Sequence, residues 1–201
     1  MTVAGLVLAA GEGRRLGTPK ALLRVDGQLL VERAVATLRL AGCAPVVVVL
    51  GAAATEVART AELGDAVVVV NEGWSTGMGS SLCTGLTALG DLRASAAAVL
   101  LVDQPQVGPE LVRRLVAHHS DGVAAVSASY DGRRRNPVVL DASVWAGVMA
   151  TAEGDIGARR WLDTHSEEVV LVACDDLGSD LDIDTPRDLE RLTHDATKGS
   201  A

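Results

Sequence analysis

The sequence predicts an α/β fold with a mostly parallel sheet between two layers of helices. Apolar runs at 3–10, 46–50 and 96–102 have the length of strands and little polar alternation, which is typical of strands buried on both faces. Segments with helical spacing of apolar residues separate the strand-like runs in the first third of the chain. The order strand, helix, strand, helix, strand predicts right-handed crossovers and parallel pairing. We therefore expect a three-layer α/β/α sandwich.

Length and composition fit one domain with a sizeable core. The chain has 201 residues, of which 48% are hydrophobic and 22% are charged, a globular balance. We expect a single domain over residues 1–196 and a loose tail over residues 197–201. Aromatic residues make up only 2% and Phe is absent, so Val, Leu and Ala have to build the core.

Charge and cysteine content exclude several classes of protein. A formal net charge of −8 is unfavourable for binding nucleic acid or an anionic membrane, both of which require basic surfaces. No apolar run is long enough to span a membrane, and no basic segment precedes the first run as it would in a secretion signal. Three cysteines without metal-like spacing fit a reducing compartment. We expect a cytoplasmic protein with no nucleic-acid partner and no membrane partner.

A glycine-rich loop with basic residues follows the first apolar run, and it contains Gly11, Gly13, Arg14, Arg15, Gly17 and Lys20. Glycine allows positive φ, and successive N–H groups in such a turn bind anions, so the loop is expected to bind a triphosphate that Arg and Lys neutralise. The Walker loop does not fit, because Ala21 follows Lys20. The dinucleotide fingerprint misses its third glycine by one position. An ordinary turn with solvated arginines is the alternative.

The next segments continue the alternation of strands and helices. Residues 29–41 have helical spacing, and Gly42 is a stop signal directly after them. The apolar strand at 46–50 follows, then a helix over about 51–63 and a short strand at 67–70. This order fits the right-handed crossovers and the mostly parallel sheet predicted above.

A polar, Gly-rich segment at 71–81 is unsuited to the core. Ser80 or Ser81 is expected to cap a helix over about 82–89. The N-terminus of that helix would offer unpaired N–H groups to an anion or a carbonyl. A capped loop that binds no ligand is the alternative.

Asp103 directly follows the strand at 96–102, in an Asp-Gln-Pro sequence. Open α/β sheets bind ligands beyond the carboxyl ends of their strands. A carboxylate at that position can hold Mg²⁺, which proteins bind through few carboxylates together with substrate phosphates. A simple turn residue before proline is the alternative.

The second half of the chain predicts further elements of both kinds. A helix is expected at 108–119, a strand at 123–130 followed by an Asp-Gly hairpin turn, a helix at 141–150 and a strand at 168–173. Three arginines, the last of them Arg135, follow the hairpin turn and form either a solvated edge or a clamp for a phosphate.

Two acidic motifs allow two interpretations: their aspartates either belong to a functional site or cap a helix. Asp155 is placed to cap the helix that carries Arg159. Near the C-terminus, Asp184 or Thr185 can cap a helix that begins with Pro186.

The glycine-rich loop resembles the signature of MobA-like nucleotidyltransferases, L-A-(A/G)-G-x-(G/S)-x-R-(M/L)-G-x-x-K. The matching residues are Leu8, Ala9, Ala10, Gly11, Gly13, Arg15, Leu16, Gly17 and Lys20. The segments around Asp103 and Asp184 are similar to two further motifs of this family, so the resemblance extends over residues 6–190. It implies the Rossmann-like fold of nucleotide-diphospho-sugar transferases.

The resemblance also implies roles for individual residues. The implied catalytic residues are Lys20, Arg15 and Asp103, and the implied Mg²⁺ ligands are Asp103 and Asp184, with Asp182 as the rival of Asp184. The implied nucleotide-binding residues are Leu8, Ala9, Ala10, Gly11, Gly13, Arg15, Lys20, Gly79, Ser80, Ser81 and Asp103. The implied acceptor-binding residues are Arg135, Asn136, Pro137, Asp155 and Arg159; Arg135-Asn136 departs from the Gly-His that usually precedes this proline in molybdopterin cytidylyltransferases.

The branch that the chain resembles most is that of the molybdenum cofactor cytidylyltransferases. This chain begins its loop with Leu-Ala-Ala-Gly, at residues 8–11, which is typical of relatives that use CTP. Relatives that use GTP tend to have Leu-Ala-Gly-Gly at this point. The expected reaction transfers CMP from CTP to a phosphate-bearing acceptor, molybdopterin, with release of pyrophosphate and with a molybdoenzyme as a further partner. The alternatives are a sugar- or alditol-phosphate nucleotidyltransferase, an NAD(P)H-dependent oxidoreductase of the same branch, and a cofactor-maturation chaperone without turnover.

Overall fold

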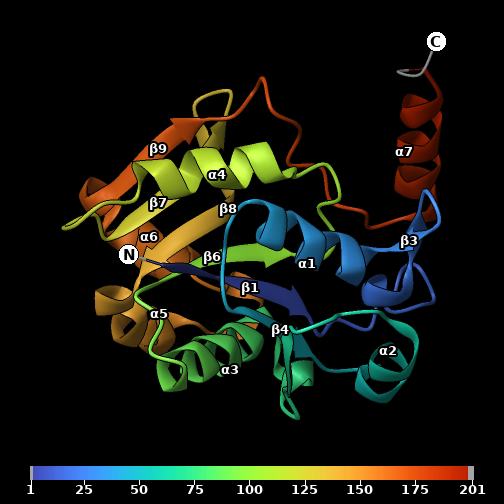
Figure 1. Cartoon of the computed structure of the whole chain (residues 1–201), viewed down its shortest axis with the longest axis horizontal. Coiled ribbons are helices and arrows are strands. Elements are labelled where there is room, and N and C mark those ends of the chain that lie inside the picture. The colour runs from blue at the N-terminus through green and yellow to red at the C-terminus, as the bar shows by residue number, and fades with distance from the viewer. Residues whose placement is uncertain (1, 199–201) are drawn as a thin grey trace.

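A seven-stranded sheet runs through the computed structural model, which describes residues 2–198 (Figure 1). Its strands, in spatial order, are β5 (Val67–Val70), β4 (Val46–Leu50), β1 (Val3–Ala9), β6 (Ala96–Leu101), β8 (Arg133–Asp141), β7 (Ala125–Tyr130) and β9 (Val169–Ala173). Only β8 is antiparallel to its neighbours in this sheet of the described chain. The predicted α/β class with a mostly parallel sheet is therefore confirmed.

Helices cover both faces of the sheet (Figure 1). The α-helices are α1 (Leu30–Leu40), α2 (Ala54–Thr60), α3 (Met78–Asp91), α4 (Pro109–His118), α5 (Trp145–Thr151), α6 (Arg159–Thr164) and α7 (Pro186–Lys198). A two-stranded ribbon of β2 (Arg24–Val25) and β3 (Gln28–Leu29) lies beside α7, and five short 3₁₀ turns occur within the described chain: η1 (Lys20–Leu22), η2 (Trp74–Thr76), η3 (Ala142–Val144), η4 (Gly154–Ile156) and η5 (Ser166–Glu168). No described helix combines the length and the apolarity needed to cross a bilayer.

The alternation of side chains along β1 explains the two helical layers. Val7 and Ala9 pack in one hydrophobic cluster with α1, α2 and α4, whereas Leu6 and Leu8 pack in a second cluster with α3, α5 and α6. Successive residues of a strand point to opposite faces, so a fully apolar strand requires cover on both. All seven residues of β1 are buried, as that pattern requires.

The order of the strands creates a reversal beside β1. From β1 the chain passes through α1 to β4 and through α2 to β5, moving outward in one direction. It then returns through α3, on the opposite face, to β6 on the other side of β1. The connections leave the adjacent strands β1 and β6 in opposite directions, and such a switch point is where open α/β sheets bind ligands.

Several predicted boundaries differ from the structure. The helix expected from residue 82 begins at Met78, so the capping role assigned to Ser80 or Ser81 is wrong: both lie inside α3, after Gly77. The helix expected over 141–150 starts at Trp145, because β8 extends through Asp141. Helix α7 includes residues 197 and 198 of the expected tail, and residues 199–201 lie outside the described part of the chain.

A glycine in α3 allows this helix to approach the sheet closely. A Cβ built on Gly85 would lie 2.4 Å from Leu6 Cδ1 and 3.1 Å from Val49 Cγ2. We expect Gly85→Ala to lower the free energy of unfolding by about 1–3 kcal/mol through overpacking. Equilibrium urea denaturation measures the change.

Gly90, in the same helix, is the matched control. A Cβ there would meet nothing within 4 Å, so Gly90→Ala should raise the free energy of unfolding by about 0.4–1 kcal/mol by restricting the unfolded chain. Equal effects of the two substitutions would contradict the close packing of α3 on β1.

Candidate active site

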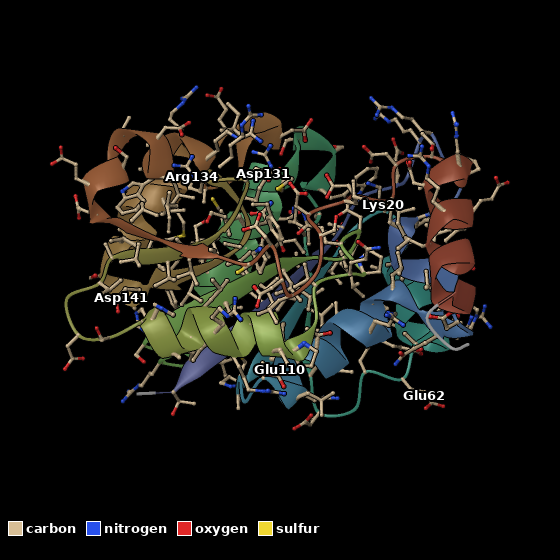
Figure 2. All side chains as sticks on the ribbon, turned by 90° about the horizontal axis from the view of Figure 1, so that it is seen from above. Lys20, Glu62, Glu110, Asp131, Arg134 and Asp141 are labelled. Carbon is tan, nitrogen blue, oxygen red and sulfur yellow. The ribbon has the colours of Figure 1, made fainter. Side chains whose placement is uncertain are left out.

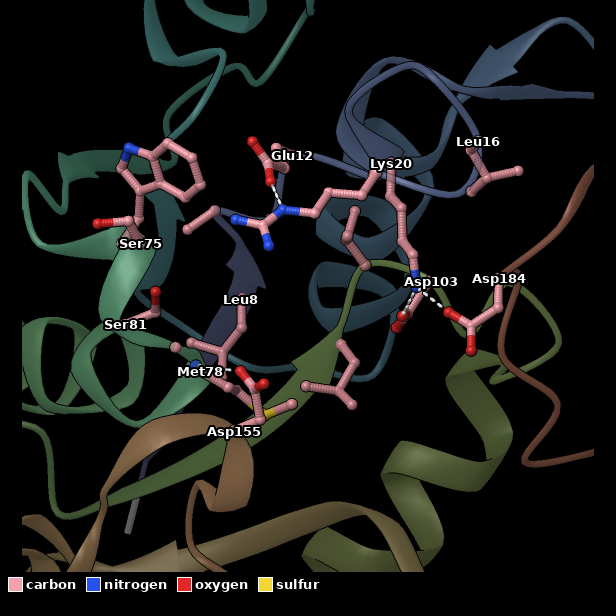
Figure 3. Close-up of a pocket in the computed structure, with 18 of the residues that line it drawn as sticks. Leu8, Glu12, Leu16, Lys20, Ser75, Met78, Ser81, Asp103, Asp155 and Asp184 are labelled. Atoms are coloured by element: carbon pink, nitrogen blue, oxygen red, sulfur yellow. Dashed lines mark hydrogen bonds and ion pairs between the residues drawn. The ribbon is translucent and has the colours of Figure 1, made fainter.

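A cavity of about 460 Å³ opens at the switch point, beyond the carboxyl ends of β1 and β6 (Figure 3). Its lining combines four parts: the loop after β1, the end of β6, the segment that leads into α3, and single residues from the second half of the chain. The lining residues are Leu8, residues 10–16, Lys20, residues 74–78, Ser81, residues 101–103, Asp155 and Asp184. Eight of the eleven predicted nucleotide-binding residues are among them; Ala9, Gly79 and Ser80 are not.

The loop after β1 makes a tight turn at Gly13. Gly13 has φ +65°, and a Cβ on it would lie 2.0 Å from the carbonyl oxygen of Thr18, so only glycine fits. Its own carbonyl accepts hydrogen bonds from the N–H groups of Leu16 and Gly17, at 2.9 and 3.0 Å. The turn projects Arg15 into solvent at the cavity rim, where its side chain is 77% exposed. A flexible cation beside such a turn is suited to bind phosphate oxygens.

Lys20 connects two carboxylates on the floor of the cavity (Figure 3). Its Nζ lies 2.5 Å from Asp103 Oδ2 and 2.6 Å from Asp184 Oδ1. Burial acts to lower the pKa of Lys20, but attraction and hydrogen bonds from Asp103 and Asp184 outweigh burial and raise the pKa above its ordinary value. Lys20 therefore stays charged at neutral pH, and its ammonium has a third N–H to offer a ligand.

Asp184 reaches Lys20 because the segment before α7 is tied to the end of β6. The N–H of Ile183 donates to the carbonyl of Asp103 at 2.9 Å, and the Ile183 side chain is fully buried. Of the two predicted caps of α7, the structure uses Thr185: its hydroxyl accepts from the N–H of Asp188 at 3.4 Å, and the Asp188 carboxylate accepts from the N–H and the hydroxyl of Thr185, at 2.8 and 2.7 Å. Asp184 is thus left free to bind Lys20 and to lie 3.7 Å from Arg15 Nη1.

Asp182 lies outside the cavity lining, although it is only two residues away. Its Oδ1 accepts a hydrogen bond from Gln104 Nε2 at 2.9 Å. Burial and the nearby Asp103 charge raise the pKa of Asp182 above its usual range. Of the two rival carboxylates, the structure therefore brings Asp184 to Asp103 and Lys20 and engages Asp182 with Gln104.

The wall opposite Lys20 is formed by the segment that enters α3. Asn71 is buried, and its side-chain amide donates to Ser80 Oγ and Ser81 Oγ at 2.8 and 3.0 Å. The hydroxyls predicted as helix caps thus hold the preceding segment against the helix, and Ser81 lines the cavity. Gly79 is buried against the backbone of Ala152, where a Cβ would lie 2.9 Å from the carbonyl carbon, and it does not line the cavity.

Asp155 caps a helix, but a different one from the helix predicted. Its Oδ1 accepts from the N–H of Met78, in the first turn of α3, at 3.3 Å. The predicted capping of α6 is therefore wrong, because the structure brings η4 against the start of α3 and not against the start of α6. Asp155 lines the cavity near Met78 and Ser81 (Figure 3).

Residues 5–170 match the MobA-like NTP transferase domain. The chain belongs to this family. The predicted family is thereby confirmed.

Relatives of this MobA-like chain carry different names. It is 42% identical over 197 residues to the nicotine blue oxidoreductase of Paenarthrobacter nicotinovorans. The alignment covers 94% of this chain and 96% of that protein. It is 36% identical over 144 residues to a probable molybdenum cofactor guanylyltransferase of Opitutus terrae, and this alignment covers 64% of this chain and 66% of that protein.

Two solved mycobacterial structures are similar to the MobA-like chain. A homologue of Mycobacterium tuberculosis Rv0371c from Mycobacterium sp. strain JC1 has a TM-score of 0.84 and 32% identity, with 98% of this chain and 97% of that chain covered. The Rv0371c complex with manganese has a TM-score of 0.79 and 28% identity, with 96% and 99% covered.

Four of the five predicted acceptor-binding residues lie outside the cavity lining. Arg135 pairs with Asp180, at 2.7 Å between Nε and Oδ2, and Arg159 is exposed at the start of α6. Asn136 and Pro137 form a bulge in β8 opposite Ser127. Arg134, the neighbour of Arg135 in the chain, lies far to the left of Lys20 in Figure 2. Acceptor binding by these four residues stays a prediction.

Sequence reasoning missed two residues of the MobA-like site, Asn71 and Trp74. Asn71 organises the wall that leads into α3, and Trp74 lines the cavity. A signal for Trp74 was present, since the chain has only three Trp, one Tyr and no Phe, and this one lies in a polar loop. Nothing in the local sequence pattern indicates the hydrogen bonds that Asn71 donates to the serines of α3.

The oxygen ligands of the site fit a divalent cation. Asp103 and Asp184 converge from different segments on one positive group, the ammonium of Lys20. Hard cations such as Mg²⁺ prefer carboxylate oxygens and are bound through one or two of them together with substrate phosphates. Within the described residues no cluster of three or more metal-ligating side chains occurs, so this pair with a phosphate ligand is the arrangement that fits.

Proposed function

We propose that the chain is a nucleotidyltransferase that moves a nucleoside monophosphate from a nucleoside triphosphate to a phosphate-bearing acceptor and releases pyrophosphate. The observation that carries this proposal is the ammonium of Lys20 between Asp103 and Asp184, at the floor of a cavity rimmed by the glycine-rich turn. Phosphate-binding donors and metal-binding carboxylates thus lie side by side, as phosphoryl-group chemistry requires.

The residues of the site have different roles in the proposed reaction. The turn around Gly13 and the Arg15 guanidinium bind the triphosphate, and the third ammonium N–H of Lys20 donates to an oxygen near the reacting phosphorus. Asp103 and Asp184 would hold a divalent cation, Mg²⁺, which would supply positive charge for the phosphate oxygens. The protein therefore contributes positioning and charge stabilisation, and no covalent step on a side chain is needed.

For the base and the acceptor we propose CTP and molybdopterin. Ala10 is one of the residues that line the cavity, and we propose that its methyl group leaves less space for a purine than a glycine would. The named molybdenum cofactor relative uses a guanylyl group, so the preference for CTP rests on Ala10 and on the resemblance of the loop.

The base preference has a direct measurement. We expect kcat/KM for CTP to exceed that for GTP by roughly tenfold, since about 1.4 kcal/mol of overpacking against a purine corresponds to this factor. Ala10→Gly should reduce the ratio toward one. Equal use of the two nucleotides by the unmodified protein with the same acceptor would remove the argument from Ala10.

A second candidate function is NAD(P)H-dependent reduction. The observation that favours it is the 42% identity to a nicotine blue oxidoreductase over nearly the full length of both chains. A nicotinamide dinucleotide shares phosphates and planar rings with a nucleoside triphosphate, so the same cavity has the groups to bind either.

Two assays on the purified protein separate the candidates. With molybdopterin as acceptor, CTP and Mg²⁺, we expect pyrophosphate release that depends on all three components. Lys20→Ala should lower the turnover at least tenfold, because about 1.4 kcal/mol of transition-state stabilisation is lost. Consumption of NADPH with an oxidised pigment as acceptor, without pyrophosphate release, would favour the reductase, and release by folded Lys20→Ala at the unmodified rate would remove Lys20 from the reaction.

The two rival carboxylates give a further prediction. Asp184→Asn should keep the melting temperature, since Thr185 and Asp188 cap α7, but should lower Mg²⁺-dependent turnover at least about tenfold because an amide is a poor ligand for a hard cation. Binding of Mn²⁺, followed by electron paramagnetic resonance, should weaken in parallel.

Asp182→Asn is the matched control, two residues away and outside the cavity lining. It should keep both turnover and Mn²⁺ binding. The reverse result, with loss in Asp182→Asn and none in Asp184→Asn, would assign the ligand role to Asp182.

A further inference from the structure

The aromatic residues of the chain are few, and one of them has an unusual place. All four lie in the described part of the structure: Trp74, Tyr130, Trp145 and Trp161. Trp145 of α5 and Trp161 of α6 are buried in the core, at 6% and 4% exposure. Trp74 alone among the four lines the cavity. An indole in a ligand cavity offers a large flat surface on which a planar ring can stack.

The backbone around Trp74 leaves little freedom for its position. A Cβ on Gly51 would lie 2.6 Å from Trp74 Cβ and 2.7 Å from the carbonyl oxygen of Ala10. Residue 51 therefore has to be glycine for Trp74 to pack over the ends of β1 and β4. The Trp74 side chain therefore starts close to Ala10, the residue that begins the glycine-rich loop, and both residues line the cavity.

Asn71 fixes the same segment from the other side. Its N–H donates to the carbonyl of Leu50 at 2.8 Å, and its Oδ1 accepts from the N–H of Gly73 at 2.9 Å. Its Nδ2 donates to the two serine hydroxyls of α3 as described above. The N–H of Trp74 in turn donates to the Asn71 carbonyl at 3.2 Å. The platform is thus built before a ligand binds, which lowers the ordering cost of binding.

The cavity is polar at one end and carries this ring at the other. Lys20 and Asp184 lie on one side of the close-up, and Ser75 and Ser81 lie on the other (Figure 3). Trp74 directly precedes Ser75 in the segment that lines the cavity. We propose that Trp74 is the stacking platform for the nucleobase of the triphosphate. The inference rests on the proposed function and adds the residue that binds the base.

The chemistry of Ser81 agrees with a base in this place. Its hydroxyl accepts from Asn71 Nδ2, so its own proton remains available for an acceptor atom on the edge of a stacked ring. Stacking itself tolerates every base, since each has a flat face, whereas the edge contacts discriminate among bases. Trp74 therefore contributes affinity for nucleotides in general, and the choice of base stays with Ala10 and Ser81.

Calorimetric titration and tryptophan fluorescence test the platform. With Mg²⁺ present, CTP should quench the fluorescence of Trp74 above the constant signal of the two core tryptophans, and inorganic tripolyphosphate should bind without this quenching. Trp74→Leu should raise the Kd for CTP about tenfold or more and abolish the quenching, while the Kd for tripolyphosphate stays within about twofold. Trp74→Phe, which keeps a flat ring, should retain most of the CTP affinity.

The outcomes separate a stacking role from a structural one. Equal losses of CTP and tripolyphosphate binding in Trp74→Leu would overturn the proposal, as would unchanged CTP affinity in that variant. Binding of NADPH but of no nucleoside triphosphate to the unmodified protein would also overturn it. Trp74-dependent binding of CTP without any pyrophosphate release would uphold the platform and refute the transferase function.

Discussion

The ammonium of Lys20 holds the site together through two carboxylates that are distant in sequence. Asp103 follows it by 83 positions and Asp184 by 164. Without a cation between them, two carboxylates at this spacing repel each other and raise the free energy of the folded state. Lys20 and Asp103 are both mostly shielded from solvent, at 18% and 17% exposure, so their attraction is screened less than that of a surface pair. The glycine-rich loop, the end of β6 and the start of α7 are thereby joined at one point.

The contacts of Lys20 with Asp103 and Asp184 illustrate how much of the site could be predicted from the sequence. Lys20 and Asp103 each follow a strand whose continuous apolar pattern is legible in the sequence, and parallel strands end at the same edge of the sheet. The fold class therefore places both near one edge of the sheet, whereas the contact of Lys20 with Asp103 depends on the path of the loop after β1. Asp184 needed the family motif, because its segment is not a strand but is tied to β6 by the hydrogen bond of Ile183.

What could not be predicted depends on contacts between segments that are not adjacent in sequence. Ser80 and Ser81 have the right chemistry for a helix cap, and local reasoning assigned it to them. The structure satisfies the start of α3 with Asp155, 77 positions away, and uses the serines to bind Asn71. A local propensity was overridden here by tertiary hydrogen bonds, which leave no periodic trace in the sequence.

The close approach of two loops makes the wall of the cavity one rigid unit. A Cβ on Gly77 would lie 2.4 Å from the backbone of Gly154, so the segment before α3 and the η4 turn touch through their main chains. Asp155 adds a hydrogen bond across the same contact. Any movement of η4 would therefore displace the wall that carries Trp74.

The paired carboxylates also bear on the choice between a transferase and a reductase. Both reactions use a ligand with phosphates and a planar ring, so the glycine-rich turn and Trp74 do not distinguish them. A hydride passes between carbon atoms and needs no divalent cation beside the phosphates. Transfer of a nucleotidyl group develops charge on phosphate oxygens and gains from a cation held there. Asp103 and Asp184, which face one positive group in the cavity, have the carboxylate oxygens that such a cation would need, and this is the physical reason to propose transfer ahead of reduction.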